Sequence, residues 1–392
     1  MEQRSSCSDK TVIYIHIPFC RSFCTYCDFY SEVAAKCRRA EDEISQSELF
    51  EDFVKAVECE ISYRAGEMSP GLNTLYIGGG TPSVLPLSAY ASMLSSLSAA
   101  GIAAPFREFT FEVNPEDVVE KGAGYVRGLL ELGVNRISMG VQSFDDGILK
   151  WMNRRHDAAA AVKAYAVLEE AGVQNISIDL IFGLPQLSDE QWRETVKAAL
   201  EISASGIPPK HISAYQLSVE PGSALAKLVE RGLWSEASDE LCARQYAILC
   251  DMLSQAGYHH YEISNFAMPG YEAVHNGAYW KHLPYVGLGP GAHSFSGTAR
   301  SWNLSDLKAY IASPLSAREG EELDEGQLDM ERIMLGLRTS EGISEAYLRE
   351  HVDTRALGHA FSCGDLIHLP SGKVRIPEER FFISDAIISE II

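Results

Sequence analysis

Six short apolar segments alternate along the chain with segments that have the period of amphipathic helices. The apolar segments are rich in Ile, Val, Phe and Tyr, which is typical of buried parallel strands. Six such strand–helix units predict an α/β fold, a parallel sheet curled into a partial (β/α)6 barrel of the TIM type. The predicted strands cover residues 11–17, 73–77, 107–113, 135–141, 175–182 and 211–217.

Local signals support the helices between these strands. Ser188, with Gln191 three residues later, has the spacing of a capping box at a helix start. Asp117 suits the first turn of another helix, and Gly172 suits the left-handed residue that ends a third. A further helical segment is expected from Leu49 onward.

Unusual sequences occur where the predicted strands end. In such barrels the chemistry collects at the carboxyl ends of the strands. We therefore expect one rim of the barrel to form the functional site. The sequences, in chain order, are the cysteines at 20–27, GGGTPS at 78–83, EVNPE from Glu112, GVQSF with Gln142, Asp179 ahead of FGLP, and QLSVEPGS from Gln216.

Charge and hydropathy exclude several classes of protein. The 392 residues carry a formal net charge of -21, which disfavours a nucleic-acid partner because such proteins usually present a basic face. No apolar run reaches the roughly 18 residues of a membrane span. The first ten residues lack the apolar core of a signal peptide. The sequence therefore predicts a cytoplasmic protein with reduced thiols.

Three of the nine cysteines, Cys20, Cys24 and Cys27, are spaced C-x-x-x-C-x-x-C. Thiolates in a reducing compartment favour zinc or iron–sulfur clusters, and a redox-active thiol group is an alternative. A structural zinc needs four ligands, and His16 is better explained as a histidine packed on its strand. A four-iron cluster normally takes four thiolates, so three leave one iron open to an outside ligand.

This spacing, with Tyr26 before the last cysteine, resembles the cluster motif of radical S-adenosylmethionine (SAM) proteins. In that family SAM chelates the open iron, and an electron from the cluster cleaves its sulfonium. The resemblance implies a 4Fe–4S cluster on the three cysteines with SAM beside it. Glycines such as Gly79 and Gly80 let backbone approach the methionine part of SAM. The resemblance also implies that Glu112 accepts hydrogen bonds from the SAM amino group or ribose.

Further motifs narrow the resemblance to the branch that contains oxygen-independent coproporphyrinogen dehydrogenase and the HemW haem chaperones. The motifs are HIPFC, GGGTPS, EVNPE, SMGVQSF, DLIFGLP and EPGS, and the similarity runs from Tyr14 to about Gly342. The resemblance implies that the cluster-bound SAM contacts Tyr14, Tyr26, Gly79, Thr81 and Glu112, and that a second SAM contacts Gln142, Arg154 and Asp179.

Two departures favour the chaperones over the dehydrogenase. The dehydrogenase has a further cysteine two positions after the third, where this chain has Phe29. An apolar ring cannot replace a thiol in redox chemistry. The dehydrogenase also has a longer segment ahead of its cluster, whereas 19 residues precede Cys20 here.

The sequence HNGAYW at residues 275–280 matches the H-N-x-x-Y-W pattern associated with the chaperones. His275 or Tyr279 offers an axial ligand to haem iron, and Trp280 offers a flat apolar surface. Packing at a domain junction is the alternative explanation. Other possible ligands nearby are His259, His260, His282 and His293.

The expected organisation has three parts. These are a core barrel with the cluster over residues 1–235, a connecting region with the HNxxYW motif over 236–300, and a smaller α+β, winged-helix-like domain over 301–392. The expected function is a radical SAM-type haem chaperone that binds a 4Fe–4S cluster, SAM and haem. It would deliver haem to acceptor proteins and take electrons from a donor such as flavodoxin or ferredoxin.

Two enzymatic functions remain as alternatives. One is coproporphyrinogen dehydrogenase, which converts coproporphyrinogen III to protoporphyrinogen IX; we expect this activity to be absent. The other is a tRNA-modifying radical enzyme, which the acidic charge disfavours.

Overall fold

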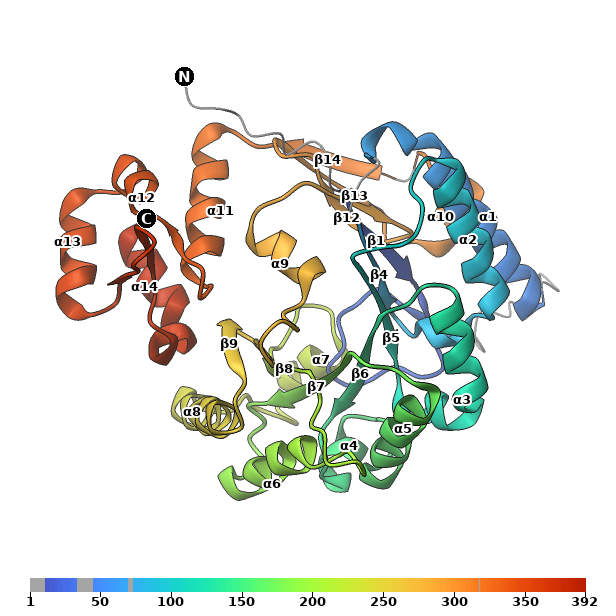
Figure 1. Ribbon diagram of the computed structural model, residues 1–392, viewed down its shortest axis with the longest axis horizontal. Helices are drawn as coiled ribbons and strands as arrows, with labels where there is room; N and C mark the ends of the chain where they lie inside the picture. The colour runs from blue at the N-terminus through green and yellow to red at the C-terminus, as the bar shows by residue number, and fades with distance from the viewer. Residues whose placement is uncertain (1–10, 34–44, 70–72, 317) are drawn as a thin grey trace.

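The computed structural model describes residues 11–33, 45–69, 73–316 and 318–392 (Figure 1). Parallel strands form its centre, each hydrogen-bonded to the next along the chain. All six predicted strands are present, so the α/β partial barrel is confirmed. The strands are β1 (Val12–Ile17), β4 (Thr74–Gly79), β5 (Glu108–Val113), β6 (Arg136–Gln142), β7 (Ile176–Phe182) and β8 (His211–Gln216).

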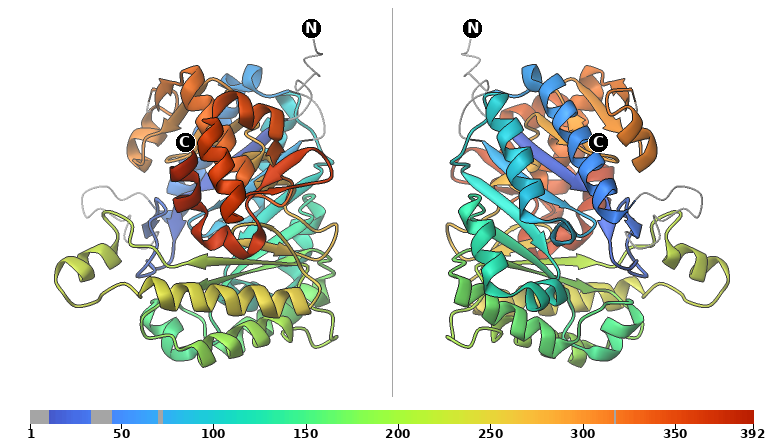
Figure 2. Two further views of the ribbon diagram at one scale, coloured as in Figure 1. Left: turned by 90° about the vertical axis from the view of Figure 1, so that its left-hand side faces the viewer. Right: turned by 90° about the vertical axis from the view of Figure 1, so that its right-hand side faces the viewer.

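Helices cover the outside of this curved sheet (Figures 1 and 2). They are α1 (Gln46–Tyr63), α2 (Leu87–Ala99), α3 (Pro115–Glu131), α4 (Asp146–Trp151), α5 (Ala158–Ala171), α6 (Asp189–Leu200) and α8 (Asp239–Gln255). The short helix α7 (Ala224–Glu230) projects away from the barrel instead (Figure 2). The predicted Ser188 capping box begins α6, and Gly172 ends α5 with a φ of 94°. α1 starts ahead of the expected Leu49, because Ser45 and Glu48 form a capping box.

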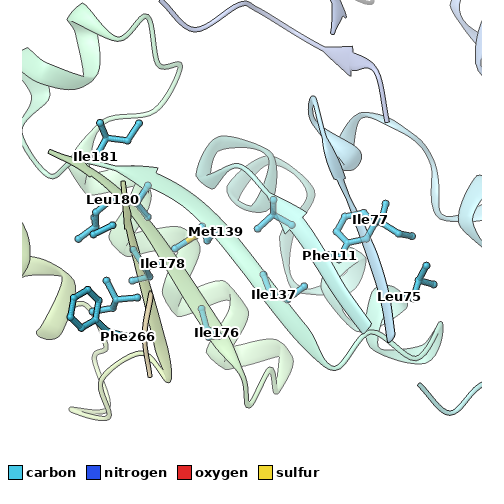
Figure 3. Close-up of a cluster of buried hydrophobic side chains, with 14 of the residues drawn as sticks. Leu75, Ile77, Phe111, Ile137, Met139, Ile176, Ile178, Leu180, Ile181 and Phe266 are labelled. Carbon is cyan, nitrogen blue, oxygen red and sulfur yellow. The ribbon is translucent and has the colours of Figure 1, made fainter. Parts of the chain in front are cut away.

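The strands alternate between apolar and polar side chains. The hydrophobic residues of Figure 3, such as Ile77, Phe111 and Met139, are buried and belong to the core. The neighbouring positions carry Tyr76, Glu112 and Ser138, which line a cavity. The strands are therefore apolar toward the helices and polar toward the inside of the barrel.

Further strands extend the sheet at both edges and were missed in the sequence analysis. β11 (Tyr285–Leu288) pairs parallel with β1, and antiparallel strands follow: β12 (His293–Phe295), β13 (Ala299–Asn303) and β14 (Arg318–Glu322). At the other edge lie β10 (Asn265–Ala267) and β9 (His259–Glu262). The complete order is β14-β13-β12-β11-β1-β4-β5-β6-β7-β8-β10-β9.

Short elements complete the barrel region. A two-stranded sheet pairs β2 (Phe19–Cys20) with β3 (Glu32–Val33). Single helical turns are η1 (Ala65–Glu67) and η2 (Pro82–Val84). Helix α10 (Leu307–Ala312) packs against α1, whereas α9 (Val274–Trp280) lies on the inner side of the curved sheet (Figure 1).

The C-terminal part is a separate group of helices beside the barrel (Figure 1). It contains α11 (Glu325–Leu337), α12 (Glu345–His351), α13 (Thr354–Cys363), η3 (Glu378–Ile383) and α14 (Ser384–Ile391). A small antiparallel sheet in the order β15 (Ile343–Ser344), β17 (Lys373–Arg375), β16 (Ile367–His368) packs with them. The three domain boundaries and the winged-helix-like assignment stay predictions.

Membrane-spanning helices were searched for in the ranges given above. No helix there is long and apolar enough to cross a membrane. The sequence inference about the first ten residues lies outside the described residues.

A buried ion pair joins α1 to the edge extension of the sheet. Arg64, 2% exposed, donates from Nη1 to Glu60 Oε1 at 3.0 Å and to the Gly287 carbonyl at 2.6 Å. Its Nη2 donates to the Ser294 hydroxyl at 2.9 Å. Glu60 in turn accepts from the Gly289 amide, the Asn303 amide group and the Tyr310 hydroxyl. Strands β11, β12 and β13 are therefore fastened to α1 through one pair of charges.

We expect Arg64→Met to destabilise the protein by about 3–5 kcal/mol, because it leaves the buried Glu60 carboxylate without its partner. Urea unfolding followed by circular dichroism measures the change. The control, Arg193→Met on the exposed face of α6, should stay within about 0.5 kcal/mol of the parent. Equal stabilities for the two variants would contradict this role of the pair.

Candidate functional site

A cavity of about 410 Å³ opens at the carboxyl ends of the barrel strands. This volume lies within the roughly 300–1,000 Å³ typical of small-molecule sites. The predicted cluster and SAM residues, apart from Tyr14, line it together: Cys20, Tyr26, Cys24, Cys27, Gly79, Gly80, Thr81, Glu112, Gln142, Arg154 and Asp179. The structure thus brings residues from 160 positions of sequence to one rim, as the strand-end pattern predicted.

The cysteine loop that follows β2 is held against the end of α4. The Thr25 amide donates to the Met152 carbonyl at 3.0 Å, and its hydroxyl donates to the Trp151 carbonyl at 3.0 Å. Two side chains from other strand ends reach the sulfurs. The Thr81 hydroxyl lies 3.5 Å from Cys20 Sγ, and Arg154 Nη1 lies 3.4 Å from Cys24 Sγ.

The donor set fits an iron–sulfur cluster better than a single metal ion. Three thiols line one cavity, and the Arg154 guanidinium lies beside the sulfur of Cys24. Across the described ranges, no three His, Cys, Asp or Glu side chains are spaced to hold one ion. A polynuclear cluster separates its thiolates more widely than a single ion does.

Two glycines after β4 are required by close packing. Gly79 has a φ of +107°, and a Cβ on it would lie 2.5 Å from the His16 ring. A Cβ on Gly80 would lie 2.7 Å from the Phe19 carbonyl oxygen and 3.1 Å from Cys20 Sγ. The glycine run therefore lets β4 approach the cysteine strand, besides leaving backbone open to the cavity.

Glu112, at the end of β5, is the central carboxylate of the cavity. Its Oε1 accepts from the Tyr76 hydroxyl at 2.6 Å, and its Oε2 accepts from the Gly79 amide at 3.1 Å. Burial raises the pKa of the Glu112 carboxyl to about 7. The side chain is thus fixed in place and poised to change charge near neutral pH.

Arg154, Asp179 and Gln142 also line the cavity. Arg154 Nη2 donates to Asn114 Oδ1 and to the Gly140 carbonyl, both at 2.7 Å. Asp179 accepts from the Ser138 hydroxyl, and burial raises the pKa of its carboxyl. Gln142 has a φ of 70°, a left-handed conformation that costs of order 1–3 kcal/mol in a residue other than glycine. That strain turns the chain at the end of β6, beside the cavity.

Comparison with known proteins agrees with this geometry. Residues 14–199 match the family model of the Radical SAM superfamily. The protein named Heme chaperone HemW of Synechocystis sp. is 35% identical over 351 residues, which cover 86% of this chain and 80% of that protein. The protein of the same name from Bacillus subtilis is 34% identical, and 86% of each chain is covered. This chain belongs to the HemW family of radical SAM proteins.

Family membership implies a 4Fe–4S cluster and SAM. Among solved structures, coproporphyrinogen III oxidase (HemN) from Escherichia coli superposes with a TM-score of 0.77 at 21% identity. The match covers 97% of this chain and 89% of that one. At this identity the likeness shows that the two proteins share a fold.

Tyr14 is the predicted SAM residue that does not line the cavity. Its hydroxyl is hydrogen-bonded to His16 Nδ1 at 2.9 Å, and its ring lies 6.0 Å from that of Tyr76, which does line the cavity. His16 Nε2 is hydrogen-bonded to the Tyr30 carbonyl, so His16 is the packed histidine that the sequence analysis expected. Tyr14 supports the cavity wall from behind, and its direct contact with SAM stays a prediction.

Phe29, the residue that replaces a cysteine of the dehydrogenase, lies at the cavity mouth. Its side chain is 64% exposed and is one of the residues that line the cavity. Phe23 and Tyr215 are also exposed there. The mouth of the cavity is therefore aromatic.

His275 and Tyr279, the predicted haem residues, lie on α9 inside the barrel, and neither lines the cavity. His275 Nδ1 is hydrogen-bonded to the Thr74 hydroxyl at 2.9 Å, and Nε2 to the Tyr279 hydroxyl at 2.8 Å. Burial lowers the pKa of the His275 imidazole to about 3, so the ring is neutral. Their role in haem binding stays a prediction.

The alternative histidines differ in the exposure of their rings and in the hydrogen bonds that the rings already make. His260 is buried against Tyr246, His282 is hydrogen-bonded to Glu331, and His259 lies 3.3 Å from Glu272. His293 is exposed and stacks on Trp302, and its ring makes no hydrogen bond within the ranges that the structure describes. His293 is thus the most available imidazole of these four.

Several residues of the site were missed from the sequence. Asn114, Tyr76 and Ser213 line the cavity, and so do Arg136, which begins β6, and Asn276 of the HNxxYW motif. The alternation of side chains could have found Tyr76 and Arg136, because Tyr76 lies four residues before Gly80 and Arg136 lies six residues before Gln142.

We expect SAM affinity to fall as the pH is lowered through about 7, because Glu112 takes up a proton and loses its charge. Glu112→Gln should bind SAM about 10- to 100-fold more weakly at pH 8, with a smaller loss at pH 6. Anaerobic calorimetry on cluster-loaded protein measures both. The SAM amino group titrates in both proteins, so the difference between them isolates Glu112.

Glu131→Gln, an exposed change on α3, is the matched control and should follow the parent. Identical pH curves for the parent and Glu112→Gln would contradict a charged contact.

Proposed function

We propose that this protein is a radical SAM-type haem chaperone, which binds a 4Fe–4S cluster, SAM and haem and passes haem to acceptor proteins. The proposed binding of the cluster and SAM rests on one observation, which is that three thiols and eight predicted SAM residues line one cavity. Cys20, Cys24 and Cys27 would hold the cluster, which supplies an open iron for SAM and an electron. The chain's own side chains orient SAM and shield it from water.

The haem function rests on different observations. Relatives at 34–35% identity are named heme chaperones, and the HNxxYW motif lies on a helix inside the barrel. A neutral imidazole is the form that ligates iron, and His275 stays neutral at ordinary pH. To bind haem iron, His275 would exchange its hydrogen bond to Thr74 or to Tyr279 for the metal. We therefore propose that haem binding moves α9.

The alternative function is coproporphyrinogen dehydrogenase, which the fold shared with HemN favours. Phe29 argues against it, because an exposed ring stands where that enzyme has a thiol. Cytoplasmic action, an electron donor such as flavodoxin or ferredoxin, and the absence of nucleic-acid binding stay predictions from the sequence.

We expect Cys24→Ala to lose the cluster, because two thiolates cannot hold four irons with one site already open. Iron and sulfide per chain after anaerobic reconstitution measure the loss, and SAM binding should weaken with it. Cys59→Ala, an exposed cysteine of α1, is the control and should keep the parent's iron content. Four irons per chain in Cys24→Ala would refute the ligand assignment.

We expect one haem to bind per chain, with no protoporphyrinogen formed from coproporphyrinogen III, SAM and a reductant under anaerobic conditions. Absorbance titration and a turnover assay measure the two. His275→Ala and Tyr279→Phe should shift the Soret band and weaken haem binding, because they remove a ligand or its partner. Cluster content should be unchanged, since the cysteines lie at the opposite strand ends.

The control is His351→Ala, an exposed histidine of α12. If the His275 and Tyr279 variants bind haem like the parent, the ligand assignment is wrong and His293 becomes the next residue to change. Turnover of coproporphyrinogen would overthrow the chaperone function.

A further inference from the structure

Arg136 is a buried charge whose guanidinium has no hydrogen-bonded partner among the described residues. It begins β6 and is 2% exposed, and it faces the inside of the barrel, where it lines the cavity. Its Nε is buried without a hydrogen bond, and no hydrogen bond or ion pair reaches its guanidinium from residues 11–33, 45–69, 73–316 or 318–392. A guanidinium has five donors, and a buried donor left without a partner is unfavourable.

The carboxylates nearest to Arg136 are already engaged. Glu108 accepts from the Val274 amide at 2.7 Å and the His275 amide at 3.0 Å, both at the start of α9. Asp179 accepts from the Ser138 hydroxyl. These acidic groups balance the charge of Arg136 through space, but they do not occupy its donors. The donors that remain free belong to a residue that lines the cavity.

Arg136 lies one inward position deeper than Glu112. Arg136 pairs with Thr110 and Glu112 pairs with Ser138, so the two levels are two residues, or about 7 Å, apart along the strands. Tyr76 and Asn276 line the cavity near this depth, and the field of Arg136 contributes to the lowered pKa of His275. The inside of the barrel therefore holds a buried guanidinium one inward position beneath the carboxylate of Glu112.

We propose that Arg136 forms a second subsite, deeper in the barrel than the predicted SAM residues. This subsite would bind an alkyl carboxylate of a second ligand of the cavity. The guanidinium fork matches a carboxylate in a bidentate contact, and a dry site strengthens that contact. The proposal rests on the proposed haem function, since the carboxylates of haem are its propionates. The methionine carboxylate of a second SAM offers the same chemistry.

The test compares haem with haem dimethyl ester, in which the propionates are esterified and uncharged. The parent should bind haem about 10- to 100-fold more tightly than the ester. Arg136→Gln should lose that preference and bind both at the ester's affinity, and Arg136→Lys should keep part of it. Arg127→Gln, an exposed arginine of α3, makes the same charge change and should behave like the parent.

Each outcome decides the proposal. Equal affinity of the parent for haem and ester overturns it, and this measurement needs no variant to fold. An equal loss of both ligands in Arg136→Gln also overturns it, because Arg136 would then act on structure alone. If haem affinity is unchanged but SAM stoichiometry falls from two to one in Arg136→Gln, the carboxylate is that of a second SAM.

If the parent binds no haem, the proposed function fails. The carboxylate subsite is then tested separately with sodium propionate, a smaller carboxylate. Sodium propionate should raise the thermal midpoint of the parent above that in sodium chloride of equal ionic strength. The same increase in Arg136→Gln, or no increase in the parent, would overturn the carboxylate subsite.

Discussion

The carboxylate of Glu108 holds the amino end of α9 inside the barrel by accepting the Val274 and His275 amides. An anion at a helix start is favoured by the unpaired amides there. With α9 so placed, His275 reaches the Thr74 hydroxyl at the beginning of β4, and Asn276 lines the cavity. The buried carboxylate of Glu108 thus fixes the position of α9 inside the barrel, and with it the position of the HNxxYW motif.

The polar inner face of the strands explains why this barrel holds a ligand instead of a packed core. In a filled barrel the inward side chains are apolar and interlock in layers. Here the inward positions carry Tyr76, Glu112, Ser138 and Asp179, while the outward positions pack against the helices. The raised pKa of Glu112 shows what burial of these groups costs. The polar lining therefore lowers the stability of the fold but provides a ligand site. The buried pair of Arg64 and Glu60 stabilises the sheet elsewhere.

Sequence reasoning found what local pattern and strand order determine. The six parallel strands, the Ser188 capping box and the meeting of the unusual sequences at one rim follow from short-range signals and from strand order. Individual SAM residues such as Arg154 were named through the family resemblance. The extension β11–β14 was missed because its strands are short, and β13, with the sequence ARSWN, has no apolar alternation. Its pairing depends on long-range contacts of Arg64. Arg136 was missed for a similar reason, since its lack of partners appears only once the neighbours are placed.

The two ends of the barrel strands are far apart, yet the side chain of Tyr76 contacts groups near both. Thr74 and Gly79 are the two ends of β4, five residues and about 16 Å apart, so the cluster loop and His275 lie at opposite ends. Tyr76 lies between them. Its hydroxyl donates to Glu112, and its ring lies 5.2 Å from the His275 ring. A movement of α9 that freed His275 would therefore change the packing of Tyr76. Through the hydrogen bond of Tyr76 it would also affect Glu112, the carboxylate proposed to contact SAM.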